Sequence, residues 1–242
     1  RLRPFTFSKP KGFVRIAGSR GVDHILTKIG KSLTKNTPLC LITGYKSAQI
    51  EQYLNKNYSD QFNIGYVEQI PLGYQGDVPY FSGLGHAILL TQDWFNSSTG
   101  ESIGELQPDD TLIFLSDMIP VKDYKFILEI LAQEDNDGVI GTMIVPKDKT
   151  QFYGIVETNK ENYITDMKEK PKFTTSNQAI SGVYALKAKT MTRLYEIMEE
   201  QYSEHKKEVE KIIKQKIEFQ LTPSLQQLVE EGYKIKSAVF KE

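Results

Sequence analysis

Short apolar runs alternate with segments of helical periodicity along the first half of the chain. The apolar runs occupy residues 13–17, 38–43, 62–67, 111–115 and 138–144. The helical segments, in which apolar residues recur every three or four positions, occupy residues 22–33, 47–55, 84–95 and 123–133. Strands that alternate with helices typically form a mostly parallel sheet covered on both faces. The pattern therefore predicts a doubly wound α/β fold with a mostly parallel sheet.

The second half of the chain has a different pattern. It contains shorter, more polar strands at 152–158, 163–168 and 179–185, with a hairpin turn at 159–162. These strands predict a smaller mixed β lobe that lies on the main sheet and holds a substrate. We treat residues 1–242 as one domain with halves at 1–150 and 151–242, because chains of this length and hydrophobic content commonly form a single core.

A Glu- and Lys-rich stretch at 190–217 carries apolar residues at helical spacing. Such spacing is typical of one or two amphipathic surface helices. A helix that binds a partner is the functional alternative, and a homo-oligomer is equally compatible with the sequence.

Charge and composition limit the classes of partner. Thirty Lys and Arg residues against 31 Asp and Glu residues leave a formal net charge of −1, so no global field favours nucleic acid or an acidic membrane surface. No apolar stretch approaches the roughly 20 residues that span a bilayer, and no signal peptide opens the chain. We therefore expect a cytoplasmic protein in which the single cysteine, Cys40, is a buried apolar residue.

Three acidic or basic side chains stand at the ends of predicted strands. Asp117 follows the apolar run 111–115, at the place where open α/β sheets hold ligands, and a carboxylate there suggests a bound metal ion. Glu169 and Lys170 end the strand before Pro171, where they suit sugar hydroxyls and a phosphate. A surface acid and an exposed ion pair remain the simpler interpretations.

Two further segments are candidates for binding phosphate or a base. Four cations, Arg1, Arg3, Lys9 and Lys11, lie around prolines at the start of the chain and would surround a polyphosphate with charge-assisted hydrogen bonds. The turn at 83–86 precedes a helical run, and its glycines would let a base or phosphate approach the backbone. A solvated terminus and a simple tight turn are the alternatives.

Taken in order, these segments resemble the sugar-1-phosphate nucleotidyltransferases, and within them most closely the bacterial-type UTP-glucose-1-phosphate uridylyltransferases. The resemblance covers nearly the whole chain. Its motifs are Arg1-Leu2-Arg3-Pro4, Lys9-Pro10-Lys11, Gln69 with Gly83-Leu84-Gly85-His86-Ala87, Leu115-Ser116-Asp117, Tyr153-Gly154-Ile155-Val156, Glu169-Lys170-Pro171-Lys172, Asn177 and Glu218-Phe219-Gln220-Leu221-Thr222.

The resemblance implies a Rossmann-like fold and a role for each matched residue. Arg1 and Lys11 would hold a triphosphate, Gln69, Gly83 and Gly85 would recognise the base, and Asp117 would bind Mg²⁺. Gly154, Glu169 and Asn177 would contact the sugar, and Lys170 would hold its phosphate. A nucleoside triphosphate and a hexose 1-phosphate would thus be the substrates, with residues 1–150 as the nucleotide half and 151–242 as the sugar-phosphate half. A sugar-phosphate oxygen would attack the α-phosphorus of UTP or dTTP in line and release pyrophosphate.

The chain departs from the family pattern in several places. The family's glycine turn would lie upstream of Arg1 and its second metal aspartate beyond Glu242, Ser19-Arg20-Gly21 replaces Lys-Pro-Met, and Pro223 replaces Asp. The interval between Gln69 and Gly83 is also longer than usual. These departures motivate the alternative of a catalytically silent module that binds nucleotide or a regulatory partner.

Overall fold

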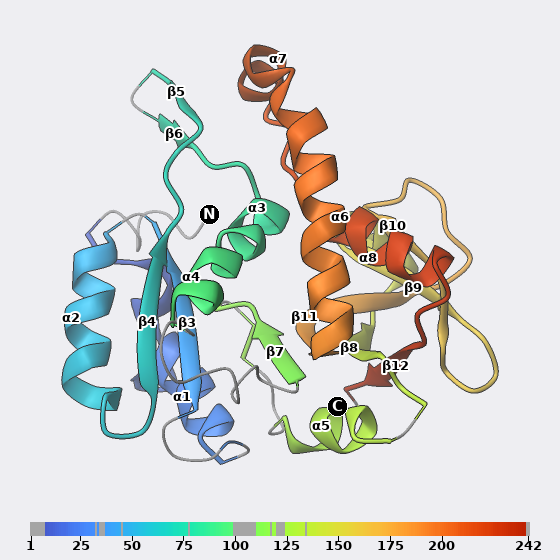
Figure 1. Ribbon diagram of the computed structural model, residues 1–242, viewed down its shortest axis with the longest axis horizontal. Coiled ribbons are helices and arrows are strands. Elements are labelled where there is room, and N and C mark those ends of the chain that lie inside the picture. Colours follow the sequence, from blue (N-terminus) through green and yellow to red (C-terminus); the bar gives the residue numbers. More distant parts are fainter. Residues whose placement is uncertain are drawn as a thin grey trace.

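The computed structural model describes residues 8–31, 33, 37–44, 46–76, 78–98, 110–116, 118–119, 124–133 and 135–240. They form a mixed α/β structure around a six-stranded sheet (Figure 1). The strands of this sheet are β7 (Asp110–Phe114), β8 (Gly138–Ile144), β9 (Gly154–Thr158), β10 (Ile164–Glu169), β11 (Gln178–Lys187) and β12 (Ile235–Val239). Their order is β10-β9-β11-β8-β12, and β7 pairs with β11. The α/β prediction is confirmed.

The sheet is mixed because β11 runs antiparallel to all three of its partners, β7, β8 and β9, whereas β8 and β12 are parallel. Its ten residues are long enough to pair with β9 at one end and with β7 at the other. The register with β8 shifts between Ile180 and Tyr184, and Gly182 within this interval has φ +78°. A residue with a positive φ is most easily a glycine, so Gly182 marks the point where β11 changes partners.

The other elements lie around this sheet. Three two-stranded pairs are formed by β1 (Arg15–Ile16) with β2 (Ser19–Arg20), β3 (Pro38–Thr43) with β4 (Asn63–Glu68), and β5 (Gly73–Gln75) with β6 (Val78–Tyr80). The helices are η1 (Lys11–Phe13), α1 (Gly21–Ile29), α2 (Ser47–Tyr58), α3 (Leu84–Leu89), α4 (Thr91–Ser98), α5 (Lys125–Leu131), η2 (Lys147–Phe152), α6 (Ala188–Lys206), α7 (Val209–Gln215) and α8 (Thr222–Glu230). In Figure 1, α3 and α4 lie between the β3–β4 pair and α6; α4 contacts both strands, and α3 contacts α6.

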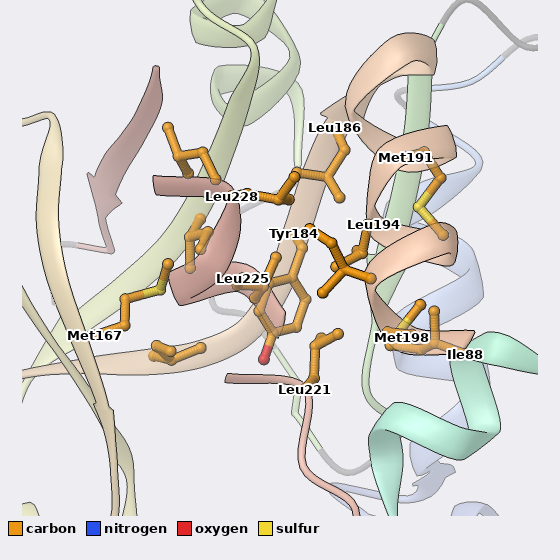
Figure 2. Packing of buried hydrophobic residues seen from close by; sticks show 14 of the residues in the cluster. Ile88, Met167, Tyr184, Leu186, Met191, Leu194, Met198, Leu221, Leu225 and Leu228 are labelled. Atoms are coloured by element: carbon orange, nitrogen blue, oxygen red, sulfur yellow. The ribbon is translucent and has the colours of Figure 1, made fainter. Parts of the chain in front are cut away.

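One hydrophobic core joins β11 to α6 and α8. Leu186 and Tyr184 of β11 point toward Leu194 of α6 and toward Leu225 and Leu228 of α8, all of them buried (Figure 2). A second core packs α1 and α5 against β3, α2 and β8, and it also includes residues of β11 and β12. The prediction of amphipathic helices at 190–217 is confirmed as α6 and α7, and the buried face of α6 explains their apolar periodicity.

Some sequence predictions need correction. The apolar run 13–17 is not a buried strand: it contains the end of η1 and the two-residue β1, because Ala17 and Gly18 both adopt positive φ and turn the chain into β2. The helical segment 84–95 is divided into α3 and α4, which meet where the Thr91 hydroxyl donates to the carbonyl oxygen of Ile88. The β5–β6 hairpin was not predicted at all.

Two smaller expectations also have outcomes in the structure. Cys40 is a free cysteine whose side chain is half-buried, and burial raises the pKa of its thiol to about 12. No helix in the described part of the chain is long and apolar enough to cross a membrane.

Candidate functional site

Gln69, at the end of β4, lies against Gly83 and Gly85 at the start of α3. The backbone N–H of Gln69 donates to Thr43 O over 2.8 Å, which extends the β3–β4 pairing by one residue. Its side-chain Nε2 donates to Gly83 O at 3.0 Å and lies 3.3 Å from Nδ1 of His86. With its amide nitrogen used in this way, Gln69 presents its Oε1 as a hydrogen-bond acceptor.

The two glycines permit a close approach by a distant segment. We call residues 218–222 the bridging segment. A Cβ on Gly83 would lie 2.7 Å from Phe219 O, and a Cβ on Gly85 would lie 2.7 Å from Cδ1 of Phe219. The Phe219 N–H donates to Ser82 O (2.6 Å), and the Gly85 N–H donates to Phe219 O (2.9 Å). The Gly85 N–H is therefore paired within the chain, and the space left by both glycines is used by the bridging segment.

An aromatic cluster supports this turn from α6. The His86 ring stacks on Tyr202 with centroids 4.4 Å apart, and Tyr202 and His205 both lie against Phe219, at 5.3 and 5.5 Å. Burial lowers the pKa of His86, and the positive charge of Lys206 and the nearby His205 lower it further. A neutral His86 offers an unprotonated ring nitrogen to Gln69, so the cluster helps to orient the Gln69 amide.

Gly154, Glu169 and Lys170 come together where β9 and β10 pair. Glu169 is the register partner of Gly154, and a Cβ on Gly154 would lie 3.2 Å from Oε2 of Glu169. Lys170 has φ +45°, its N–H donates to Tyr153 O over 3.0 Å, and its Nζ lies 3.2 Å from Oε1 of Glu169. The Glu169 Oε2 accepts a hydrogen bond of 2.6 Å from the hydroxyl of Thr222.

Thr222 is the last residue of the bridging segment. The segment therefore contacts the glycine turn through Phe219 and the Gly154–Glu169 pair through Thr222. Two groups of predicted site residues, more than 60 positions apart between Gly85 and Gly154, are joined by one stretch of backbone. The sequence identifies residues 218–222 as one of the motifs of the resembled family, but it assigned no role to Phe219 or Thr222.

The other predicted site residues have separate surroundings. Asn177 exchanges hydrogen bonds with Val145, its Nδ2 donating to Val145 O at 3.1 Å, and so joins the end of β8 to the start of β11. Lys11 lies in η1, whose last turn is closed by the hydrogen bond from Val14 N to Lys11 O. Arg1 and Asp117 lie outside the described residues.

The chain next to Asp117 is nevertheless fixed. The Leu115 N–H donates to Gly182 O at 3.0 Å, and the Met118 N–H donates to Leu115 O at 3.2 Å. A Cβ on Gly182 would lie 2.8 Å from Cδ1 of Leu115. The end of β7 is thus held against the point where β11 changes partners. Within the described ranges, no three His, Cys, Asp or Glu side chains are grouped so that they would hold a metal ion.

Arg20, one of the residues that depart from the family pattern, packs against aromatic rings. Its guanidinium lies over the rings of Phe13 and Tyr53, 4.3 and 3.7 Å from their centroids. Tyr53 and Tyr58 both donate to Oδ1 of Asp23, at 2.8 and 2.9 Å. Arg20, within the segment that departs from the family pattern, therefore belongs to a local aromatic cluster beside η1 that is held by cation–π contacts and by hydrogen bonds to Asp23.

A family model described as "Nucleotidyl transferase" matches residues 1–228. The chain belongs to the nucleotidyl transferase family. This membership confirms the family to which the ordered motifs point.

Individual proteins are similar to this chain in sequence or in fold. The glucose-1-phosphate adenylyltransferase of Bacillus thuringiensis (strain Al Hakam) is 26% identical over 188 residues, which are 76% of this chain and 47% of the relative. The chain thus spans about half the length of that curated relative. A UDP-glucose pyrophosphorylase solved with UDP-glucose has a TM-score of 0.73 at 18% identity, with 100% of this chain and 86% of that chain covered. The UDP-glucose pyrophosphorylase of Acinetobacter baumanii has a TM-score of 0.67 at 19% identity, covering 100% and 82%.

The glycine turn of this nucleotidyl transferase family member gives a prediction on stability. Gly83 has φ +101° and a neighbouring carbonyl oxygen 2.7 Å from an added Cβ, whereas Gly76 has φ +60° and open space around it. We expect Gly83→Ala to lower the free energy of unfolding by at least about 2 kcal/mol more than Gly76→Ala, since only Gly83→Ala adds a clash to the backbone strain. Denaturant titration of both variants measures the difference, and equal losses would contradict the close approach.

The lowered pKa of His86 gives a prediction on pH. The folded state holds His86 neutral below the ordinary histidine pKa of about 6.5. Its contribution to stability is therefore complete above about pH 6.5 and is lost as the pH falls toward the folded pKa. We expect the free energy of unfolding to fall less between about pH 7.5 and about pH 5.5 in His86→Asn than in the wild type. An unchanged difference in His86→Asn would contradict the prediction.

Proposed function

We propose that this protein transfers a nucleotidyl group from a nucleoside triphosphate to a hexose 1-phosphate and releases pyrophosphate. UTP or dTTP and glucose 1-phosphate are the preferred substrates in this proposal. The observation that supports it most is the bridging segment, which contacts the Gly83–Gly85 turn at one end and Glu169 at the other. A transferase must hold two substrates next to each other, and one short stretch of backbone between two groups of site residues suits that need.

The proposed chemistry is a substitution at phosphorus. A phosphate oxygen of the sugar 1-phosphate forms a bond to the α-phosphorus, the bond from that phosphorus to the oxygen bridging to the β-phosphate breaks, and pyrophosphate leaves. Little covalent chemistry is required of the protein, because position and charge neutralisation provide most of the acceleration in such transfers.

Each site residue has a role in this proposal. Lys170 holds the phosphate group of the hexose 1-phosphate. Glu169 accepts hydrogen bonds from the hydroxyl groups of the hexose, with Gly154 and Asn177 as further contacts. Gln69 recognises the base through its Oε1, and the glycines at 83 and 85 support it on the base side by letting the bridging segment approach the turn. Lys11 and Arg1 neutralise the triphosphate.

Magnesium belongs to the same proposal. Carboxylate oxygens suit this hard cation, and Asp117 would hold it after the end of β7, where Leu115 and Gly182 fix the neighbouring backbone. When bound, the ion would neutralise charge on the phosphates. The cationic side chains of the protein would share that work.

A second candidate function is a catalytically silent module that binds nucleotide or a regulatory partner. Pro223, which stands where the resembled family has an Asp, favours it. In the structure Pro223 occupies the first turn of α8, directly after Thr222, where a proline is well tolerated. The two candidates differ in turnover and agree in nucleotide binding.

The test is pyrophosphate release by the intact protein with glucose 1-phosphate and magnesium, in parallel with UTP, dTTP, CTP, ATP and GTP. We expect release that depends on both substrates and is fastest with UTP or dTTP. Lys170→Met should lower kcat/KM by about 100-fold or more, because it removes the cation assigned to the sugar phosphate. Lys172→Met, two positions away, is the matched control and should stay near the wild type. No release with any nucleotide, together with a nucleotide-dependent rise in Tm, would favour the silent module.

The metal assignment has its own test. We expect Asp117→Ala to lower turnover by about 100-fold or more at saturating magnesium, because the carboxylate assigned to the ion is removed. Asp110→Ala is the control, because it removes a carboxylate at the start of the strand that precedes Asp117. The Asp110 carboxylate lies 3.7 Å from Nζ of Lys187 and has no role in the metal assignment. Titration calorimetry with magnesium and nucleotide gives a second readout. Normal turnover in Asp117→Ala would refute the assignment.

A further inference from the structure

The carboxylate of Glu169 is held from two sides. Thr222 donates its hydroxyl to Oε2 at 2.6 Å, and the Lys170 ammonium lies 3.2 Å from Oε1. Thr222 is only 5% exposed, so this hydrogen bond is largely protected from water. Gly154 leaves just enough room for the contact, since a Cβ there would lie 3.1 Å from the Thr222 hydroxyl oxygen.

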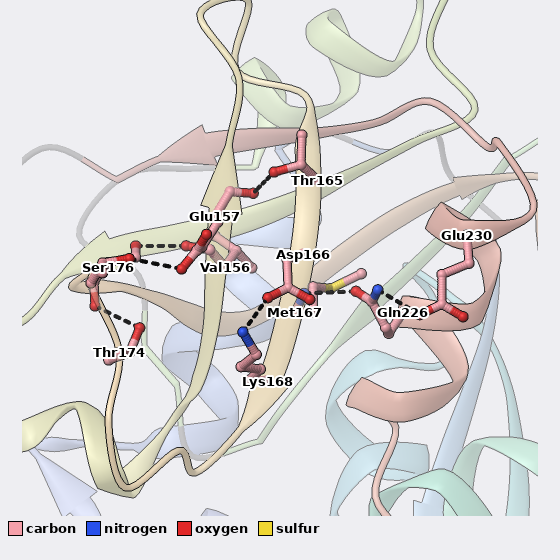
Figure 3. Close-up of polar contacts among 11 residues, drawn as sticks. Val156, Glu157, Thr165, Asp166, Met167, Lys168, Thr174, Ser176, Gln226 and Glu230 are labelled. Atoms are coloured by element: carbon pink, nitrogen blue, oxygen red, sulfur yellow. Dashed lines mark hydrogen bonds and ion pairs between the residues drawn. The ribbon is translucent and has the colours of Figure 1, made fainter.

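A second hydrogen bond fixes α8 on β10. The Met167 N–H donates to Oε1 of Gln226 over 2.7 Å, and Figure 3 shows this contact between the strand and the helix. Thr222 and Gln226 are four residues apart on the helix, which is a rise of about 6 Å. Met167 and Glu169 are two residues apart on the strand, which is about 6.6 Å. Because these spacings match, both hydrogen bonds are made in the same docked position of α8, and the Thr222 hydroxyl lies at the end of β10.

The Glu169 carboxylate keeps positions that can accept further hydrogen bonds. An ionised carboxylate accepts about four hydrogen bonds, and the Thr222 hydroxyl uses one of these sites. Without that hydroxyl, the carboxylate would be free to rotate toward Lys170 and to pair with it more closely. Such a rotation would misplace the acceptor for a sugar hydroxyl and draw the ammonium away from the sugar phosphate.

We propose that Thr222 is a positioning residue that orients the Glu169 carboxylate toward a hydroxyl group of the hexose 1-phosphate. The inference rests on the proposed function, because it assumes that Glu169 contacts the sugar. It adds a determinant of sugar recognition from α8, an element to which the sequence assigned no contact. Thr222 acts through Glu169 and does not itself touch the substrate.

The test compares Thr222→Val, which keeps the shape of the side chain but removes the hydroxyl, with Thr222→Ser, which keeps the hydroxyl. Steady-state kinetics of the intact protein give kcat and KM for each substrate. We expect Thr222→Val to raise the KM for the hexose 1-phosphate about 10-fold, equivalent to about 1.4 kcal/mol, and to change the KM for the nucleoside triphosphate less than about 2-fold. Thr222→Ser should stay within about 2-fold of the wild type for both substrates.

Monodeoxy analogues of the sugar 1-phosphate give a readout that a purely structural role would not move. The wild type should discriminate against the analogue that lacks the hydroxyl bound by Glu169, because the carboxylate then loses its partner. Thr222→Val should discriminate against the same analogue about 10-fold less, since the misoriented carboxylate no longer binds that hydroxyl well. Equal discrimination by the two proteins would overturn the inference.

Two control variants separate orientation of Glu169 from docking of α8. Gln226→Leu removes the second hydrogen bond to β10 and should lower Tm while keeping the KM for the hexose 1-phosphate within about 2-fold. Thr165 lies on β10, as Glu169 does, and Thr165→Val removes an exposed hydrogen bond of 3.3 Å to Glu157 O on β9; it should leave both KM values unchanged (Figure 3). A rise in KM with Gln226→Leu equal to that with Thr222→Val would overturn the inference.

The outcomes for the proposed function and for this inference are distinct. An inactive wild type with every pair of substrates would overturn both. An active wild type whose Thr222→Val variant keeps its KM would overturn the inference alone. If Thr222→Val fails to fold, Thr222→Ala replaces it in the same comparison, with the same expected rise in KM and the same rescue by serine.

Discussion

The contact between the bridging segment and the Gly83–Gly85 turn is the constraint on which the site depends. Phe219 is paired through its backbone to Ser82 and Gly85, residues more than 130 positions earlier in the chain. The approach is so close that both glycines would clash with Phe219 if they carried a Cβ. Because the same segment ends at Thr222, which donates a hydrogen bond to Glu169, the distance between the Gly83–Gly85 turn and Glu169 is set by four residues of backbone. A small shift of the turn would thus be transmitted to Glu169.

The electrostatics of the site follow from local arrangement and not from the overall charge. The net charge of −1 provides no attraction for polyphosphates at long range. Lys170 lies beside Glu169, with Nζ 3.2 Å from Oε1, so its charge is partly balanced by a carboxylate. The hydrogen bond from Thr222 keeps Glu169 occupied on its other side. Sharing the carboxylate between a hydroxyl and an ammonium leaves Lys170 available for an incoming anion.

The sequence predicts local structure well where the signal is local. The turn at 159–162 is an example, because Oδ1 of Asn159 accepts hydrogen bonds from the backbone of Glu161 and Tyr163 within the same few residues. The apolar run 13–17 misleads, since nothing in its hydrophobicity records the positive φ of Ala17 and Gly18. The motifs identified most of the candidate site residues, but Thr222 has no local pattern that reports a partner 53 positions away. Such contacts arise only from the packing of α8 on β10.

The longer interval between Gln69 and Gly83 is accommodated outside the Gly83–Gly85 turn. It forms the β5–β6 hairpin, whose Gly73 lies so close to α7 that a Cβ would be 2.5 Å from Cδ1 of Ile213. The Tyr80 hydroxyl donates to Ile217 O, directly before the bridging segment. The hairpin therefore packs on the chain that leads into residues 218–222, and the same residues that extend the interval also hold that chain in place. The hairpin is thus coupled to the Gly83–Gly85 turn through the position of the bridging segment.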